Sequence, residues 1–80
     1  METQYIGNEI YDTTTQGGRL SQALADAEMS QAELARQIGA YDQHVSNWVH
    51  GERQIPWARI PDIAEALGVS PAWIAWGWEE

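Results

Sequence analysis

Residues 31–51, QAELARQIGAYDQHVSNWVHG, combine two short apolar patterns of helical spacing with a glycine between them. The apolar positions are Leu34, Ala35 and Ile38 in the first pattern, and Val45, Trp48 and Val49 in the second. The second pattern leaves small amide and hydroxyl side chains on the other face of its helix. The stretch therefore predicts two short helices joined by a tight turn, the second of which has one polar face.

Residues that begin and end helices divide the rest of the chain in the same way. Ser30 and Ser70 are good N-caps, and Glu33 completes a capping box with the first of them. Gly39 is expected to end the helix that follows Ser30, because glycine adopts the left-handed C-cap conformation without strain. Asp42 is expected to cap the next helix. The predicted helices cover residues 18–28, 31–38, 42–50, 61–68 and 70–77, with residues 52–57 as a loop. The predicted fold class is all-α, with five short helices and minimal loops.

A polar arm of residues 1–17 is predicted to precede a helical domain of residues 18–78, and residues 79–80 form an acidic end. The arm is rich in threonine and contains no lysine or arginine. A loosely ordered arm is favoured over a short strand. Gly17 and Gly18 are expected to form a hinge or break between the arm and the domain.

Length and composition argue against several classes of protein. A chain of 80 residues corresponds to one domain, and it buries about 60% of its unfolded surface, which is too little for a deep cavity. The lack of cysteine excludes thiolate catalysis, disulfides and cysteine-ligated zinc. No third ligand lies at a suitable spacing from His44 and His50, so no metal site and no other cofactor are expected. We expect no enzyme activity, because no paired carboxylate, Ser-His arrangement or phosphate loop stands out.

The hydropathy pattern indicates no membrane segment. No apolar run approaches the roughly 20 residues of a membrane span, and no signal peptide precedes the body of the chain. The lack of cysteine does not identify the compartment. We expect a cytoplasmic protein.

The charge of the chain is strongly acidic. Four arginines, no lysine and twelve acidic residues give a formal net charge of −8. Because a nucleic-acid-binding protein usually carries a basic patch, this chain has one only if its few arginines gather on one face. Three of the acidic residues lie outside the predicted core, namely Glu2, Glu9 and Asp12.

Five tryptophans occur in a chain without phenylalanine. Trp48 and Trp73 are expected to take the place of leucine or phenylalanine in the core, and Trp57 is either a plug of its loop or a stacking group. Trp76 and Trp78 lie near the C-terminus, where a small domain has little left to cover them. Because exposed apolar patches tend to be interfaces, a homodimer contact through these two side chains is favoured over docking against the N-terminal arm.

Residues 18–77 resemble the helix-turn-helix domain shared by lambda-type phage repressors, Cro proteins and many small XRE-like bacterial regulators. The resemblance rests on MSQAELARQIG, VSNWVHG and IAEALGVSPAWIAWG, which match the second helix, the end of the recognition helix and the last two helices of the family. It implies a lambda-repressor-like domain in a Cro-like or repressor-like transcription regulator of a bacterium or a phage-infected cell. It also implies a homodimer that binds double-stranded DNA at a two-fold operator.

The resemblance assigns DNA contacts to individual side chains. The base-reading positions of the recognition helix, residues 42–50, are Asp42, Gln43, Ser46 and Asn47. The DNA-backbone positions are Gln31, Arg36, His44, His50, Arg53, Gln54 and Arg59. Glutamine and asparagine pair bidentately with adenine, and serine serves either type of base. Asp42 is either a helix cap or an acceptor from a cytosine amino group. Arg19, like Arg36, is either a surface solubility group or a backbone contact, and Arg36 is favoured for the contact.

Three features depart from the family pattern. Tyr41 stands where a capping serine or threonine is usual. Leu24 and Val49 replace a buried ion pair that many members carry, and two apolar side chains can do so at little cost in stability. The acidic charge leaves open an alternative function on the same fold, namely an acidic protein-binding module such as an antirepressor, an antitoxin-like partner or a DNA mimic. The amide face of the recognition helix opposes this alternative, because a mimic is expected to present carboxylates there.

Overall fold

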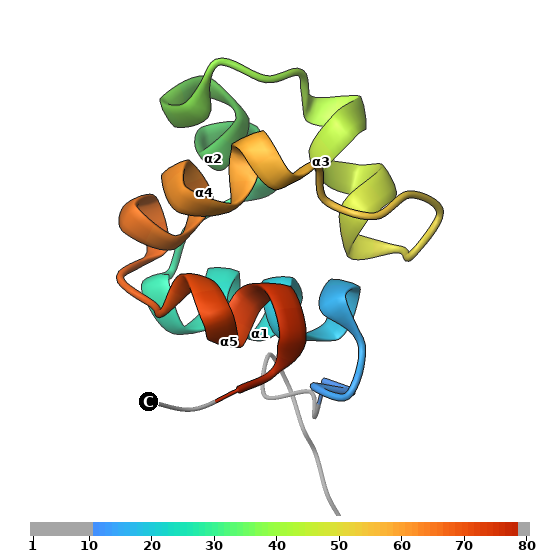
Figure 1. Cartoon of the computed structure of the whole chain (residues 1–80). Coiled ribbons are helices and arrows are strands. Elements are labelled where there is room, and N and C mark those ends of the chain that lie inside the picture. Colours follow the sequence, from blue (N-terminus) through green and yellow to red (C-terminus); the bar gives the residue numbers. More distant parts are fainter. Residues whose placement is uncertain (1–10, 79–80) are drawn as a thin grey trace, which may run out of the picture.

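The computed structural model describes residues 11–78, which form five α-helices joined by short connections (Figure 1). The helices are α1 (Gln16–Ala27), α2 (Gln31–Ile38), α3 (Asp42–Val49), α4 (Ile60–Leu67) and α5 (Pro71–Trp76), with a short 3₁₀ helix η1 (Trp57–Arg59) before α4. This arrangement confirms the predicted all-α class and the five helices. The arm residues 1–10 and the acidic end, residues 79–80, lie outside the described residues, so the expectations for them stay predictions.

One apolar core joins all five helices. Each helix contributes one side chain that is fully buried, and these are Leu20, Leu34, Val45, Ile63 and Ile74. Helices of this length are marginal on their own in water, so the shared core stabilises them together. In Figure 1, α5 packs along α1 and α4 packs along α2, while α3 lies at one side of the domain. Among the helices of residues 11–78, none has the length and apolar character that a membrane span requires.

The predicted helix ends around α2 and α5 are confirmed. The Ser30 side chain accepts a hydrogen bond from the Glu33 backbone N–H at 3.0 Å, and the Ser70 side chain accepts one from the Trp73 N–H at 3.3 Å. Gly39 ends α2 with a φ of +74°, in the left-handed region that glycine adopts without strain. The turn between α2 and α3 is therefore set by local sequence.

The expectation of a hinge at Gly17 and Gly18 is wrong. Both residues lie inside α1, which begins at Gln16 and is capped by the Thr15 side chain. A Cβ atom added to Gly17 would lie only 2.5 Å from the carbonyl oxygen of Val49 and 2.7 Å from that of Trp48. Gly17 therefore serves as a small residue that lets α1 approach the C-terminal end of α3.

This contact predicts an unusual sign for the Gly17→Ala substitution. A glycine-to-alanine change inside a helix normally stabilises a protein by about 0.5–1 kcal/mol. Here we expect a loss of about 1–3 kcal/mol in the free energy of unfolding, because the new methyl group forces two helices apart. Urea unfolding measures the loss, and Gln22→Ala on the same helix is the control, expected within about 0.5 kcal/mol of wild type. A Gly17→Ala variant as stable as the wild type would contradict the close approach.

Two further boundaries differ from the sequence-based expectation. The N-cap of α3 is Tyr41, whose side chain makes no capping hydrogen bond, and Asp42 is the first helical residue. The interpretation of Asp42 as a helix cap is therefore wrong, and its interpretation as a base contact stays a prediction. The predicted loop of residues 52–57 ends one residue early, because Trp57 begins η1.

The sequence suggested that Arg19 is either a surface solubility group or a DNA-backbone contact. Both interpretations require an exposed side chain, and both are wrong. Arg19 is only 5% exposed, and its guanidinium donates three hydrogen bonds to backbone carbonyls. Nε donates to Ile74 at 3.1 Å, Nη2 to Ala75 at 3.1 Å and Nη1 to Thr13 at 2.9 Å. Burial lowers the pKa of the Arg19 guanidinium from its ordinary value, although an arginine remains protonated at neutral pH. This side chain ties the C-terminal end of α5 to the segment before α1.

Candidate nucleic-acid interface

The helix α3 has one face in the core and one face in solvent. Val45 and Trp48 hold it in the core, which confirms the expectation for Trp48. Ala35 of α2 is buried as well, and its small side chain suits the close packing of α2 against α3. The packing of the inner face of α3 in the core therefore fixes the position of its solvent-exposed outer face.

Two amide side chains on the outer face of α3 are joined to each other. Gln43 and Asn47 lie one helical turn apart, and Nε2 of Gln43 donates a hydrogen bond to Oδ1 of Asn47 at 2.9 Å. This bond leaves Oε1 of Gln43 as a free acceptor and Nδ2 of Asn47 as a free donor. An adenine offers a donor and an acceptor side by side in the major groove, at N6 and N7. The bonded pair therefore presents the complementary groups.

Ser46 and His50 are engaged with each other at the end of α3. Nδ1 of His50 lies 2.9 Å from the Ser46 carbonyl oxygen and 3.3 Å from its hydroxyl oxygen. The His50 ring is thereby turned back onto its own helix, and Nε2 is the nitrogen left for an outside partner. Ser46 is half-buried, whereas Asp42 and Gln43 are exposed.

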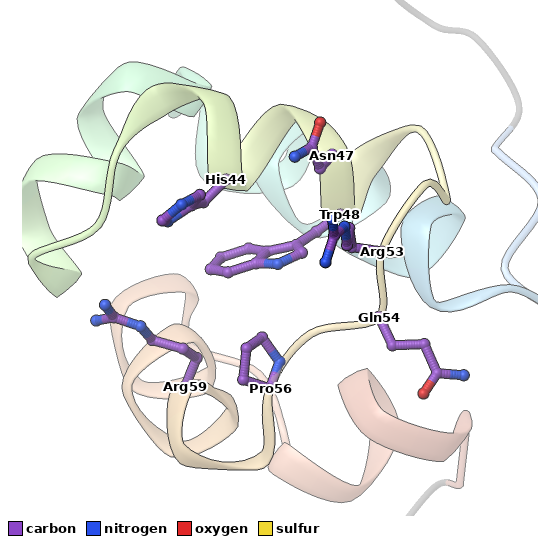
Figure 2. A pocket seen from close by; sticks show the side chains of 7 residues that line it. All are labelled: His44, Asn47, Trp48, Arg53, Gln54, Pro56 and Arg59. Carbon is purple, nitrogen blue, oxygen red and sulfur yellow. The ribbon is translucent and has the colours of Figure 1, made fainter.

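A cleft of about 460 Å³ lies beside α3 and is shown in Figure 2. It is lined by His44, Asn47, Trp48, Arg53, Gln54, Pro56 and Arg59. The structure thus brings together five of the side chains that the sequence singled out for DNA contacts. Two of the lining residues are arginines and none is acidic. Such a cleft suits a negatively charged backbone next to the outer face of α3.

The chain has a net charge of −8, but three of its four arginines lie around α3. Arg19 is buried, and the other three belong to elements that flank α3: Arg36 to the last turn of α2, Arg53 to the following loop and Arg59 to η1. The guanidinium of Arg59 already makes contacts within the protein, since it donates hydrogen bonds to the carbonyls of Ile38 and Gly39 at 2.6 and 3.4 Å. Arg36 and Arg53 are exposed.

Many of the acidic side chains lie on other parts of the molecule. Asp62 and Glu65 line a separate hollow between α2 and α4, and Asp26 lies near the C-terminal end of α1. The acidic residues on α3 and the loop that follows it are Asp42 and Glu52. The negative net charge is therefore compatible with a locally cationic cleft.

The sequence-based site residues do not include Tyr41, whose ring is exposed at the start of α3. Its side chain is 75% exposed at the start of α3, and its ring meets that of His44 edge-on with centroids 5.5 Å apart. The sequence marked this position only as a departure from the usual capping residue. The available signal was the tyrosine itself, because a large aromatic residue stands at a position where a small capping residue is usual.

A second exposed surface, the tryptophan cluster, consists of Trp57, Trp76 and Trp78. These rings are 69%, 47% and 61% exposed. Trp76 contacts Trp57 with centroids 5.1 Å apart and stacks on Trp78 at 4.7 Å. Its exposure shows that Trp57 is not a plug of its loop, and its ring meets that of Trp76 at a tilt of 53°. Trp73, expected in the core, is partly buried and packs against it.

The helix order, the glycine turn after α2 and the exposed outer face of α3 define a helix-turn-helix domain of the lambda-repressor/Cro type. Residues 20–70 match the family model described as bacterial toxin YdaS, and the chain belongs to this family. The match ends before α5, so Trp76 and Trp78 lie beyond it. No curated protein matches the chain.

Three solved structures illustrate the likeness. The P22 c2 repressor, solved in complex with a synthetic operator, is 22% identical with a TM-score of 0.75, over 80% of this chain and 97% of that chain. A hypothetical transcription factor from Neisseria, NHTF, is 26% identical with a TM-score of 0.72, over 85% and 81%. The restriction-modification controller protein C.AhdI from Aeromonas hydrophila is 27% identical with a TM-score of 0.70, over 79% and 96%. The first shows the fold alone, and all three support the helix-turn-helix class.

Proposed function

We propose that this protein is a sequence-specific DNA-binding transcription regulator that inserts α3 into the major groove of an operator. The bonded amide pair of Gln43 and Asn47 beside an arginine-lined cleft carries the proposal. The major groove admits one α-helix, and amide groups read adenine there. One solved structure with this fold is a repressor in complex with a synthetic operator, so the fold itself is compatible with DNA binding. A toxic effect, which the description of the family implies, is consistent with this mechanism, because a regulator bound at host promoters blocks their transcription.

The proposal gives separate tasks to two groups of side chains. The base-reading group is Asp42, Gln43, Ser46 and Asn47. The DNA-backbone group is Gln31, Arg36, His44, His50, Arg53, Gln54 and Arg59. Contacts to phosphate position a protein on the duplex, whereas contacts to base edges carry the sequence information. Of the first group, Gln43 and Asn47 have the best-placed free donor and acceptor.

A mobility-shift assay with the DNA upstream of the protein's own reading frame tests the proposal. We expect a shifted complex that unlabelled DNA of the same sequence displaces, whereas scrambled DNA of equal length competes at least about 10³-fold less well. Equal competition by the scrambled DNA would contradict sequence-specific binding. Complete absence of a shift across the upstream region would favour the acidic protein-binding module.

The charge distribution predicts a modest salt dependence of binding. Arg36, Arg53 and Arg59 of two subunits neutralise about six phosphates, so the slope of log K against log salt concentration is expected near −5. Titrations by fluorescence anisotropy between low and moderate salt measure this slope. A slope steeper than about −10 would show that far more cationic contacts exist than the three arginines provide.

We also propose that the protein acts as a homodimer through the tryptophan cluster. Exposed aromatic side chains in contact with one another are typical of protein interfaces, and a two-fold dimer matches a two-fold operator. Trp76 lies at the centre, since it contacts both other rings.

The Trp76→Ala substitution is expected to weaken the dimer at least about 30-fold, as loss of an interface hot spot does. Sedimentation would then show monomers, and operator binding would weaken while the far-ultraviolet spectrum stays helical. Tyr41→Ala removes an exposed ring outside the cluster and serves as the control for assembly. A wild type that binds DNA as a monomer at tens of micromolar would contradict the dimer.

The acidic protein-binding alternative has less support on the outer face of α3. The face carries two neutral amides, and the cleft beside it carries two arginines. A DNA mimic is expected to offer carboxylates at those positions. The regulator therefore remains the function that the geometry supports best.

A further inference from the structure

We propose that Gln16 is a positioning residue that couples the last turn of α5 to the loop carrying Arg53 and Gln54. The inference rests on the proposed function, because the loop residues act there on the DNA backbone. Gln16 is the first residue of α1 and is half-buried. Its side chain bridges two segments that are far from it in the sequence.

The first contact of Gln16 fixes the loop. Oε1 of Gln16 accepts a hydrogen bond from the Ile55 backbone N–H at 2.7 Å, at the short end of the range for such bonds. The Ile55 side chain is buried in the core. The residue next to Gln54 is thereby held by both its backbone and its side chain. A loop held in this way presents Arg53 and Gln54 in one arrangement before DNA arrives, and such preorganisation favours binding.

The second contact of Gln16 reaches α5. Nε2 of Gln16 donates to the Ala75 carbonyl oxygen at 3.4 Å, and the same oxygen accepts from Nη2 of Arg19 at 3.1 Å. Ala75 immediately precedes Trp76, the central ring of the tryptophan cluster. The amide of Gln16 therefore lies between the proposed dimer surface and the proposed backbone-contact loop.

Apolar packing alone does not fill the space between these two segments. A hollow of about 130 Å³ remains among Gln16, Gln54, Ile55, Trp57, Ile60, Ala75 and Trp76. The Gln16 bridge and the contact between Trp57 and Trp76 link the two segments across it. Because the bridge holds the Ile55 backbone directly, its loss is expected to loosen the loop while the core holds the fold.

The test uses Gln16→Met, which keeps the length of the side chain and removes both hydrogen bonds. Gln22→Met is the matched control, since Gln22 lies on the same helix and its side chain bonds to Asp26 at the surface. We expect Gln16→Met to speed hydrogen exchange of the Ile55 amide at least about tenfold. We further expect its affinity to fall about two- to tenfold for operator and scrambled DNA alike, at unchanged base preference. Affinities are compared at a temperature where circular dichroism shows each variant fully folded.

A double-mutant cycle separates positioning from general stabilisation. If Gln16 acts through Arg53 and Gln54, then Gln16→Met has little further effect on affinity in a background that carries both Arg53→Ala and Gln54→Ala. Gln16→Glu keeps the acceptor for Ile55 but not the donor for Ala75, so it should preserve the exchange protection of Ile55 and lose part of the affinity.

The inference is overturned by the following results. Unchanged exchange of Ile55 in Gln16→Met would disprove the bridge, whatever the DNA measurements give. An affinity of Gln16→Met equal to that of Gln22→Met would disprove positioning. An equal loss in the background that carries both Arg53→Ala and Gln54→Ala would disprove it as well. A wild type that binds no DNA would overturn the proposed function itself, and the exchange of Ile55 would then still report separately on the bridge.

Discussion

Replacement of Arg19 by methionine is expected to lower the free energy of unfolding by about 2–4 kcal/mol. Hydrogen bonds to a charged group contribute about 1.5–3 kcal/mol each, and three are lost here. Methionine retains much of the apolar stem, and removal of a desolvated charge offsets part of the loss. The carbonyls of Ile74 and Ala75 would remain at the end of α5 without this donor. Their desolvation accounts for most of the expected effect.

Urea unfolding followed by circular dichroism measures this change. A domain of this length has a total stability of about 4–12 kcal/mol, so the expected loss is a large fraction of the total. Arg36→Met, at an exposed position, is the control and should stay within about 0.5 kcal/mol of wild type. Arg19→Lys should fall between them, because one ammonium group cannot reproduce the planar fork of three donors. Equal stability of Arg19→Met and Arg36→Met would contradict the structural role of Arg19.

Alanine substitution of the amide pair should have its main effect on DNA. Each bidentate base contact provides about 1–3 kcal/mol of discrimination at its position, and a symmetric dimer makes each contact twice. Operator affinity of Asn47→Ala is therefore expected to fall by about 2–6 kcal/mol, with a similar loss for Gln43→Ala. Stability should change by only about 0.2–0.5 kcal/mol, the value of an exposed side-chain pair on a helix.

The bond between Gln43 and Asn47 predicts that the losses of operator affinity in these variants are not additive. Loss of either side chain frees the other from its partner, so the effects of the two substitutions should not add. The double variant is expected to lose less operator affinity than the sum of the single variants. Fluorescence anisotropy at one salt concentration measures all three losses. Strict additivity would mean that the two amides act on DNA independently.

Local sequence signals predicted most helix boundaries. Ser30 and Ser70 cap their helices, and Gly39 ends α2, because these effects depend on residues only a few positions apart. Asp42 failed as a cap because the helix starts there rather than one residue later. The position of a helix end therefore depends on the residues within about one helical turn of it.

Features set by distant parts of the chain were not predictable in this way. Gly17 was interpreted as a break, although its role depends on the carbonyls of Val49 and Trp48 more than thirty residues away. Arg19 was expected at the surface because charged side chains are rarely buried, and its partners lie at the far end of the chain. Trp57 could be placed in a cluster only once its contact with Trp76 was known.

The candidate site was predicted in part. The resemblance marked five of the seven residues that line the cleft beside α3, because they match the family's DNA-contact positions. It gave no warning that Arg59 is partly engaged with the turn after α2, nor that His50 folds back on Ser46. Those contacts depend on side-chain geometry, which residue spacing does not define.

Selection of binding sites from random DNA, done in parallel with wild type and three variants, tests the reading of bases by α3 most directly. We predict that Gln43→Ala and Asn47→Ala each lose the wild-type preference at the base position that the amide pair reads in every half-site. Arg53→Ala should select the same sequence as wild type with weaker binding, because a phosphate contact carries no base information. If both alanine variants of the amide pair select the wild-type sequence unchanged, the outer face of α3 does not read DNA.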